Sequence, residues 1–286
     1  PVKLNWTKNF TTKKKIMKLS TKKLSIDLLN EGNFIDGKYE YENVLDLFSS
    51  RLKTKYKILD QSLVFKSEKS LIKSTPINYN GIINFKPFNF KINIDTKKLD
   101  FSHLWKNIYL LNELIITELL LNQNLYGNIL ISSEKITKLK NFNNASLNIN
   151  FKESEINFDN TKIYSDKLGE LEVYDSSLKS IKGVAILSAK LKFKIKNQDF
   201  FNKIFLIPKK NRKKIKNIIF DTSFQLEDNS INIDGVSFEE NKNKIKNFDS
   251  IDEIIETNKR YKYDYLNPIL FRKFIKEIII NYSHAG

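Results

Sequence analysis

The sequence predicts a mainly β protein with a few helices, in which a long, curved and twisted antiparallel sheet forms a groove and an amphipathic helix ends the chain. Three observations predict this fold. Segments such as 88–94, 147–151 and 191–195 alternate apolar and polar residues one for one. Segments of this kind are more numerous than a β-sandwich needs, and only two strongly amphipathic helices accompany them. Because successive strand side chains point to opposite faces, each segment has an apolar side that something must cover.

The composition is that of a folded chain with a polar outer surface. Hydrophobic residues make up 41% of the 286 residues and aromatic residues 12%, which is too apolar for a disordered chain. The net charge of +16 invites a nucleic-acid hypothesis. The lysines are dispersed, however, so we expect no nucleic-acid partner. We interpret most of them as a solvated face, with anionic lipid head groups as the remaining possibility.

The first elements follow from the alternation. Residues 1–20 are basic and weakly periodic, and we interpret them as a ragged edge of a larger sheet. Strand signals begin at Lys22, and Gly32 and Gly37 predict a turn before a strand near Tyr39. Further strands are expected at 52–59, 62–67, 77–85, 88–95, 125–132, 146–151, 155–158, 162–165, 170–174, 185–196, 218–226 and 231–233.

Turn residues separate these strands. Asp60 and Gln61 suit a hairpin turn, and Pro87 ends one ladder and starts the next because it has no N–H to donate. Gly169 and Gly183 mark bends.

Helical spacing replaces the alternation in a few places. Apolar residues three and four apart predict a helix over 102–122, although its last part, 115–121, is also compatible with a strand. Short helices are expected at 199–206 and 248–257. The final helix begins at Asn267 and Pro268. Its apolar stripe is Phe271, Phe274, Ile275, Ile278 and Tyr282.

Three regions are expected. Residues 1–74 form a β-rich N-terminal part of the groove, 75–247 form the main groove with the helix near 102–122, and 248–286 form a C-terminal helical segment. The chain opens at Pro1, and we expect an upstream part with a membrane anchor to be missing.

The residues offer little material for catalysis or metal binding, so we expect no enzyme, no cofactor and no metal. The two histidines are His103 and His284, and no nucleophile elbow lies near either. The pair Glu239 and Glu240 is adjacent in sequence, a spacing that does not direct two ligands at one point. There are no cysteines and no glycine-rich phosphate loop.

The basic run near residue 210 is the second candidate site. Its members are Lys209, Lys210, Arg212, Lys213 and Lys214. A solvated connection explains them, and a docking patch for anionic lipid or a partner protein is the functional alternative.

The apolar strand sides are the main candidate site. About a dozen strand segments have one, and two helices cannot cover them all. Exposing a Phe or Leu costs roughly 1.5–3 kcal/mol, a cost that a bound acyl chain would relieve. The expected groove-lining residues are Phe88, Phe90, Ile92, Leu147, Ile149, Phe151, Leu191, Phe193, Ile195, Phe220 and Phe224.

Four segments also resemble the C-terminal region of the AsmA-like family, related to the TamB- and YhdP-type envelope lipid-transport proteins, and most nearly its A/T-rich marine alphaproteobacterial versions. They are Gly81 to Phe90, Leu125 to Leu130, Phe200 to Ile215, and Phe271 to Ile275. The likeness runs from about Thr75 to the end, and residues 1–74 fit only by their strand pattern.

The resemblance implies a periplasmic, inner-membrane-anchored envelope protein that takes part in lipid transport and outer-membrane assembly. Its expected partners are phospholipid or another membrane lipid, and other envelope proteins. The sequence therefore predicts a non-enzymatic protein that holds or conducts acyl chains in an apolar β-groove. The alternative is a structural or assembly module that adds a strand to a partner's sheet.

Overall fold

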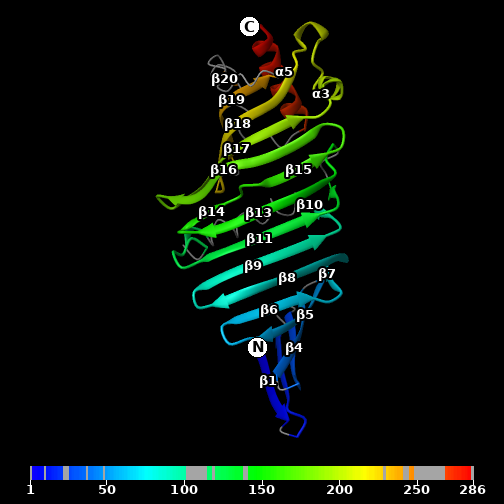
Figure 1. Ribbon diagram of the computed structural model, residues 1–286, viewed down its shortest axis with the longest axis vertical. Helices are drawn as coiled ribbons and strands as arrows, with labels where there is room; N and C mark the ends of the chain where they lie inside the picture. The colour runs from blue at the N-terminus through cyan, green and yellow to red at the C-terminus, as the bar shows by residue number, and fades with distance from the viewer. Residues whose placement is uncertain are drawn as a thin grey trace. The chain divides into compact units, whose positions relative to one another are not determined.

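The computed structural model describes most of the chain (Figure 1). The described residues are 2–9, 11–21, 26–36, 38–47, 49–100, 115–117, 120–137, 141–227, 230–240, 245–247 and 268–284. They fold into two compact units. Unit 1 comprises residues 1–99 and 124–135, and unit 2 comprises residues 100–123 and 136–286. Both are mainly β, as the sequence predicts.

Unit 1 is a meander of antiparallel strands followed by one parallel neighbour. Its strands are β1 (Val2–Asn9), β2 (Lys14–Thr21), β3 (Ile26–Ile35), β4 (Lys38–Leu47), β5 (Ser50–Ile58), β6 (Ser62–Ser67), β7 (Ser70–Ile72), β8 (Thr75–Phe85), β9 (Phe88–Thr96) and β11 (Tyr126–Ser133). Strands β1 to β5 pair in chain order, β5 pairs with both β6 and β7, and both of these pair with β8. Strand β8 then pairs with β9.

The all-antiparallel expectation is wrong at one position. Strand β11 pairs with β9 in parallel, with Gly127 opposite Phe90 and Ile129 opposite Ile92. A parallel neighbour requires a long crossover rather than a tight turn. The chain between Thr96 and Tyr126 supplies that length.

Two further N-terminal predictions need correction. Residues 1–20 are no ragged edge, because β1 and β2 pair in register over eight positions, from Val2 opposite Thr21 to Asn9 opposite Lys14. Gly32 is not in a turn but is buried within β3, and the ring of its partner Tyr41 lies over it. The hairpins around Asp60 and Pro87 are confirmed.

Unit 2 is a second antiparallel meander with helices at its end. Its longer strands are β13 (Asn144–Lys152), β15 (Thr161–Ser165), β16 (Gly169–Ile181), β17 (Val184–Ile195), β18 (Ile215–Gln225) and β19 (Ser230–Glu240). Its short strands are β14 (Glu155–Asn157) and β20 (Ile245–Asn247), and β10 (Leu99–Asp100) and β12 (Ile136–Thr137) are two-residue strands. The helical elements are α3 (Gln198–Ile204), η1 (Lys209–Asn211) and α5 (Pro268–His284).

Local signals place the main elements of unit 2. Lys182 and Gly183, with φ of 53° and 80°, make the two-residue turn between β16 and β17. The side chain of Asn197 caps α3 by accepting from the backbone N–H of Phe200 at 2.9 Å. The final helix is confirmed, and Phe274, Ile275, Ile278 and Tyr282 of its predicted stripe are all buried.

The compact units differ from the expected regions. The boundary expected after residue 74 falls inside unit 1, because Ile72 pairs with Thr75 across the turn that joins β7 and β8. Of the helix expected over 102–122, Ile115 and Ile116 are helical and Ile115 is fully buried, while 102–114 and 118–119 lie outside the described residues. The predicted helix is wrong at its end, because Thr117 and 120–122 lie in neither a helix nor a strand. The helix expected at 248–257, Asn267 and His103 also lie outside the described residues.

Candidate functional site

One side of the unit 1 sheet is built almost entirely of apolar and aromatic side chains. Residues that are paired across neighbouring strands point to the same side of a sheet. The ladders of unit 1 connect one such row from β3 to β11. The row is Gly32, Tyr41, Tyr56, Phe65, Gly81, Ile92 and Ile129. We call the side that carries this row the aromatic face.

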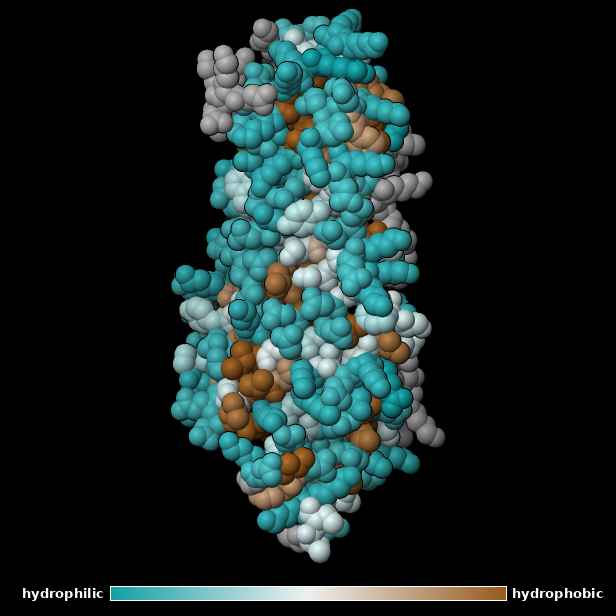
Figure 2. Space-filling view, turned by 45° about the vertical axis from the view of Figure 1, so that its right-hand side comes forward, coloured by the Kyte–Doolittle hydropathy of each residue, from teal (hydrophilic) through white to brown (hydrophobic). Residues whose placement is uncertain are grey.

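Residues two or four positions along each strand extend the aromatic face, because the side-chain period of a strand is two. They include Leu28, Tyr39, Leu45, Leu52, Leu63, Tyr79, Ile83, Phe90, Ile94 and Ile131. At the level of unit 1, brown side chains gather among the teal ones in Figure 2. The alternation in the sequence is therefore an alternation between an apolar and a polar side.

Aromatic rings stack on one another on this face. The rings of Tyr41 and Tyr56 are stacked, with centroids 4.9 Å apart and planes inclined by 9°. Tyr39 continues the stack at 5.9 Å from Tyr41, and the ammonium of Lys15 lies 3.9 Å from the centre of the Tyr39 ring. The aromatic contacts add to the apolar surface that the strands already present.

Glycines make room for two more rings. A Cβ at Gly81 would meet the ring of Phe65 at 2.6 Å, and a Cβ at Gly127 would meet the ring of Phe90 at 2.5 Å. In both pairs the ring comes from the residue directly opposite on the neighbouring strand. Each ring therefore covers bare backbone, and the face stays apolar where a glycine would otherwise expose peptide groups.

Two pairs of polar groups on the aromatic face are hydrogen-bonded within the face. Tyr56 donates its Oη hydrogen to Asn30 Oδ1 at 2.9 Å, and Thr54 Oγ1 and Tyr79 Oη share a hydrogen bond of 2.6 Å. Burial raises the pKa of the Tyr56 phenol, although the hydrogen bond to Asn30 acts in the opposite direction. The phenol therefore stays protonated and remains a donor at neutral pH. These groups do not need water to satisfy them.

The opposite side, which we call the polar face, is charged and paired. Lys53 bonds Glu42 at 2.7 Å and Lys55 bonds Glu68 at 2.8 Å. An Asn93 amide donates to Asn80 Oδ1 at 3.1 Å. Most residues that line a shallow cavity of about 660 Å³ are on this side, among them Lys55, Lys57, Lys66 and Lys91 around Val64 and Ile82. The lining also includes Tyr41, Tyr56, Phe65 and Gly81 of the row. Solvent thus wets the polar face.

The two units differ in how far their apolar side chains are buried. Within the described residues, every buried hydrophobic side chain belongs to unit 2. The apolar side chains of unit 1 that the structure describes are half-buried, or exposed as at Phe88, which is 43% accessible. The aromatic face therefore has no closed core of its own in the part of the chain that the structure describes.

Three predicted groove residues lie on the aromatic face. Phe88, Phe90 and Ile92 alternate along β9 on the same side as the row, and the rings of Phe88 and Phe90 have centroids 6.4 Å apart. Ile129, which pairs with Ile92, and Ile131, which pairs with Ile94, were not among the predicted residues. The structure therefore joins β9 and β11 into one apolar surface.

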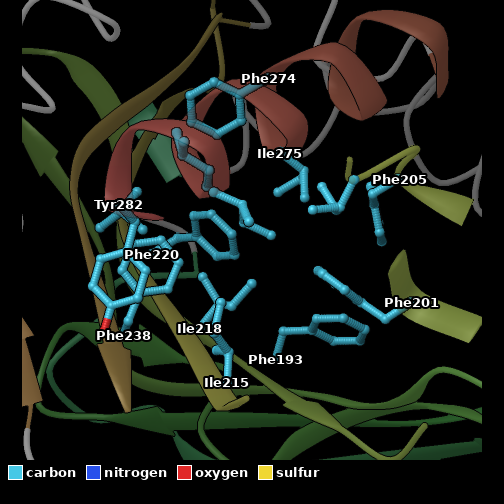
Figure 3. Packing of buried hydrophobic residues seen from close by; sticks show 14 of the residues in the cluster. Phe193, Phe201, Phe205, Ile215, Ile218, Phe220, Phe238, Phe274, Ile275 and Tyr282 are labelled. Carbon is cyan, nitrogen blue, oxygen red and sulfur yellow. The ribbon is translucent and has the colours of Figure 1, made fainter. Parts of the chain in front are cut away.

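The predicted groove is wrong at Phe193 and Phe220. Both are buried in a core that α3 and α5 close, with Phe193 5.9 Å from Phe201 and Phe220 6.5 Å from Phe274 between ring centroids (Figure 3). Over residues 272–284, the part of α5 whose side chains the structure describes, five apolar residues are buried. These side chains fill the space that an acyl chain would need.

The other predicted residues of unit 2 have mixed surroundings. Leu191 and Ile195 pack against the closed core as half-buried residues. Phe151 and Phe224 are buried, whereas Leu147 and Ile149 of β13 are half-buried. The apolar side of unit 2 is thus largely covered by protein.

The basic run has a structural role at its centre. Lys213 Nζ donates to the carbonyl of Tyr282 at 3.2 Å and lies 4.9 Å from the centre of the Tyr282 ring, so it caps the C-terminal end of α5. Arg212 Nε donates to the carbonyl of Ile207 at 3.2 Å. The exposed residues Lys209, Lys210 and Lys214 remain as a solvated patch.

Sequence reasoning missed most of the aromatic face. Tyr41, Tyr56 and Phe65 were read only as strand residues, yet they stand side by side. The signal was present as the alternating residues of 39–47, 52–58 and 62–67, which have the same apolar parity once the hairpins fix the register.

No protein-family model, curated protein or solved structure matches the chain. The resemblance to the AsmA-like family therefore stays a prediction. Among the described residues, no helix has both the length and the apolar character to cross a membrane. The same residues contain no cluster of three His, Asp or Glu side chains that could hold a metal ion.

Proposed function

We propose that the chain is a non-enzymatic protein that holds the acyl chains of a membrane lipid on the aromatic face of unit 1. The observation that carries the proposal is the row from Gly32 to Ile129, an apolar surface that includes no buried side chain within the described residues. Apolar surface removed from water stabilises a complex by about 25 cal/mol per Å². An acyl chain laid across the row would supply that burial.

The chemistry of the face suits an acyl chain better than a polar ligand. Tyr56 and Tyr79 already have partners in Asn30 and Thr54, so they offer no free groups for a sugar or peptide. The flat rings and branched aliphatic side chains offer dispersion contacts without direction. A ligand recognised by shape and apolarity alone fits this surface.

The wider role rests on the sequence resemblance. We propose an envelope protein, periplasmic and anchored in the inner membrane, that takes part in lipid transport and outer-membrane assembly. The aromatic face supports the lipid part of this proposal and leaves the location to be measured. Fractionation of cells that express the tagged chain from its own gene would measure it.

The test of lipid holding is lipid extraction from the purified chain followed by mass spectrometry. The double variant Ile92→Gln and Ile94→Gln changes the aromatic face of β9. Each substitution removes about 1 kcal/mol of apolar contact, so lipid recovered per protein should fall several-fold. The matched variant Lys91→Gln and Asn93→Gln changes the alternate residues of the same strand and should retain lipid.

Equal lipid in both double variants, or none with the unaltered chain, would count against lipid holding. Thermal unfolding of each protein controls for folding. A variant that lost lipid and also unfolded early would be replaced by the single Ile92→Gln change, which perturbs the strand less.

One observation favours a second function, strand addition to a partner protein. Among the strand pairings of the described residues, β1 has one neighbour, β2. Its side chains Leu4 and Trp6 are 62% and 67% exposed. A free edge with apolar side chains is a template for another strand. This function predicts a complex that a Trp6→Lys change disrupts and that contains no extractable lipid.

A further inference from the structure

The hairpins of unit 1 place apolar residues together along one rim of its sheet. In a meander, every second turn lies at the same end of the strands. The turns β3–β4, β5–β6 and β8–β9 therefore lie at the same end of the sheet as the start of β11, which runs parallel to β9. The last two of these turns appear on the left of Figure 1. We call this end of the unit 1 sheet the hairpin rim.

The hairpin rim exposes large apolar side chains at every one of these positions. They are Phe34, Ile35, Ile58, Leu59, Phe85, Phe88 and Tyr126. Each is between 38% and 53% accessible. Single exposed apolar residues are ordinary, but a series at successive tips of one edge marks an interaction surface.

The rim is continuous with the aromatic face. Phe34, Ile58 and Phe88 have the parity of Gly32, Tyr56 and Ile92, so their side chains lie on the aromatic side of the sheet. A chain that leaves the face at this edge passes over Phe85 and Phe88, which are paired across the β8–β9 turn. Apolar surface thus runs from the middle of the sheet to its edge.

Basic residues flank the exposed apolar tips. Lys13, Lys38 and Lys86 are exposed and have no carboxylate partner among the described residues. Asp36 and Asp60 are the acidic residues of the same turns. Apolar tips that enter the acyl region with lysines at the head-group level are the arrangement of proteins that bind the surface of an anionic bilayer.

We propose that the hairpin rim docks on the surface of a lipid bilayer that contains anionic lipid, with Phe85 and Phe88 inserted and Lys38 and Lys86 at the head groups. The inference deepens the proposed lipid-holding function, since it assigns the edge at which acyl chains cross between bilayer and sheet. An anionic bilayer fits better than a protein partner because exposed lysines stand beside the exposed apolar side chains of these turns.

The test is flotation of the full chain with vesicles of phosphatidylcholine and phosphatidylglycerol. The double variant Phe85→Ser and Phe88→Ser should bind about tenfold more weakly, because two rings no longer enter the acyl region. The control is Leu71→Ser and Ile72→Ser. These side chains have similar exposure but lie near the β7–β8 turn, at the other end of β8.

Two more measurements keep the test decisive if a serine variant folds poorly. Phe88→Trp keeps an aromatic ring and should give blue-shifted fluorescence with vesicles, whereas Ile72→Trp should not. Lys38→Gln with Lys86→Gln should weaken binding to the mixed vesicles and leave binding to pure phosphatidylcholine unchanged.

The outcomes separate docking from lipid holding. Weaker flotation of the Lys38→Gln and Lys86→Gln variant on mixed vesicles, with lipid still extractable, supports docking by the rim and leaves lipid holding intact, because neither lysine lies on the aromatic face. Flotation without any extractable lipid supports docking and removes the holding function. The docking proposal is overturned if the Phe85 and Phe88 variant floats as well as the Leu71 and Ile72 control. It is also overturned if the unaltered chain does not float with the vesicles.

Discussion

The ring of Phe90 lies over the backbone of Gly127, its partner in the parallel pairing of β9 and β11. Phe65 covers Gly81 in the same way in the antiparallel pairing of β6 and β8. The two contacts differ in what surrounds the glycine. At Gly127 the three nearest atoms to an added Cβ are all ring atoms, whereas at Gly81 the carbonyl oxygen of Lys91 is also 2.6 Å away.

This difference predicts unequal costs of adding a methyl group. Gly81→Ala should lower the free energy of unfolding by about 1–3 kcal/mol, because the backbone carbonyl of Lys91 cannot move without breaking the β8–β9 ladder. Gly127→Ala should cost less, since the Phe90 ring can turn aside. Thermal unfolding of the two variants measures the order.

A second-site change checks the cause. Phe90→Leu should recover part of the stability of Gly127→Ala, because a smaller side chain leaves room for the methyl group. If Phe90→Leu adds its own loss to that of Gly127→Ala, the ring contact is not the reason.

The closed core of unit 2 predicts a larger effect. Phe274 is 1% exposed and lies against Phe220, so Phe274→Ala should lower the free energy of unfolding by about 3–5 kcal/mol. The neighbouring exposed residue Lys273 gives the control, since Lys273→Ala leaves the core unchanged. Loss of the same size in both variants would mean that α5 contributes through its surface.

The periodicity of apolar residues in the sequence predicted the strands and helices that depend on residues close together in the chain. The alternation of 88–94 and 191–195 gave β9 and β17, and the three-and-four spacing of Phe274, Ile275 and Ile278 gave the buried side of α5. These signals depend only on the periods of strand and helix. Gly183, which was predicted to mark a bend, lies with Lys182 in the turn between β16 and β17.

The elements that cover the apolar side of each strand could not be predicted from the residues of that strand. Phe90 and Phe193 occupy the same kind of alternating segment, yet Phe193 meets Phe201 of α3 while Phe90 faces Gly127. The difference is set by elements far away in the sequence. The basic run shows the same limit, because Lys213 acquires its role from Tyr282, 69 residues later.

A network of carboxylates on unit 2 predicts acid sensitivity. The hydrogen bond from Lys194 lowers the pKa of Glu172 below its ordinary value of 4.5, although burial acts in the opposite direction. A carboxylate whose pKa is lower in the folded than in the unfolded state stabilises the fold at pH values above its unfolded-state pKa. This contribution is lost as the pH falls through the folded-state pKa. Glu172 should therefore support unit 2 at pH 5 and above, and lose this contribution on further acidification.

Glu172→Gln isolates that contribution. The variant should melt below the unaltered protein at neutral pH, and the two melting temperatures should converge as the pH falls below about 4. Parallel melting curves across the whole range would assign the loss to packing and not to charge. Lys179→Gln, which changes an exposed ion pair with Glu155, serves as the control that moves little.

The end of α5 gives the last prediction. Lys213 donates to the carbonyl of Tyr282 in the final turn of the helix, where a positive charge also meets the negative end of the helix dipole. Lys213→Ala should therefore lower the free energy of unfolding by about 0.5–1 kcal/mol and speed hydrogen exchange in the last turn. Lys214→Ala is the matched change, because Lys214 is exposed and adjacent in sequence. Equal effects of the two substitutions would show that the charge of the whole basic run, and not the hydrogen bond of one lysine, stabilises the helix.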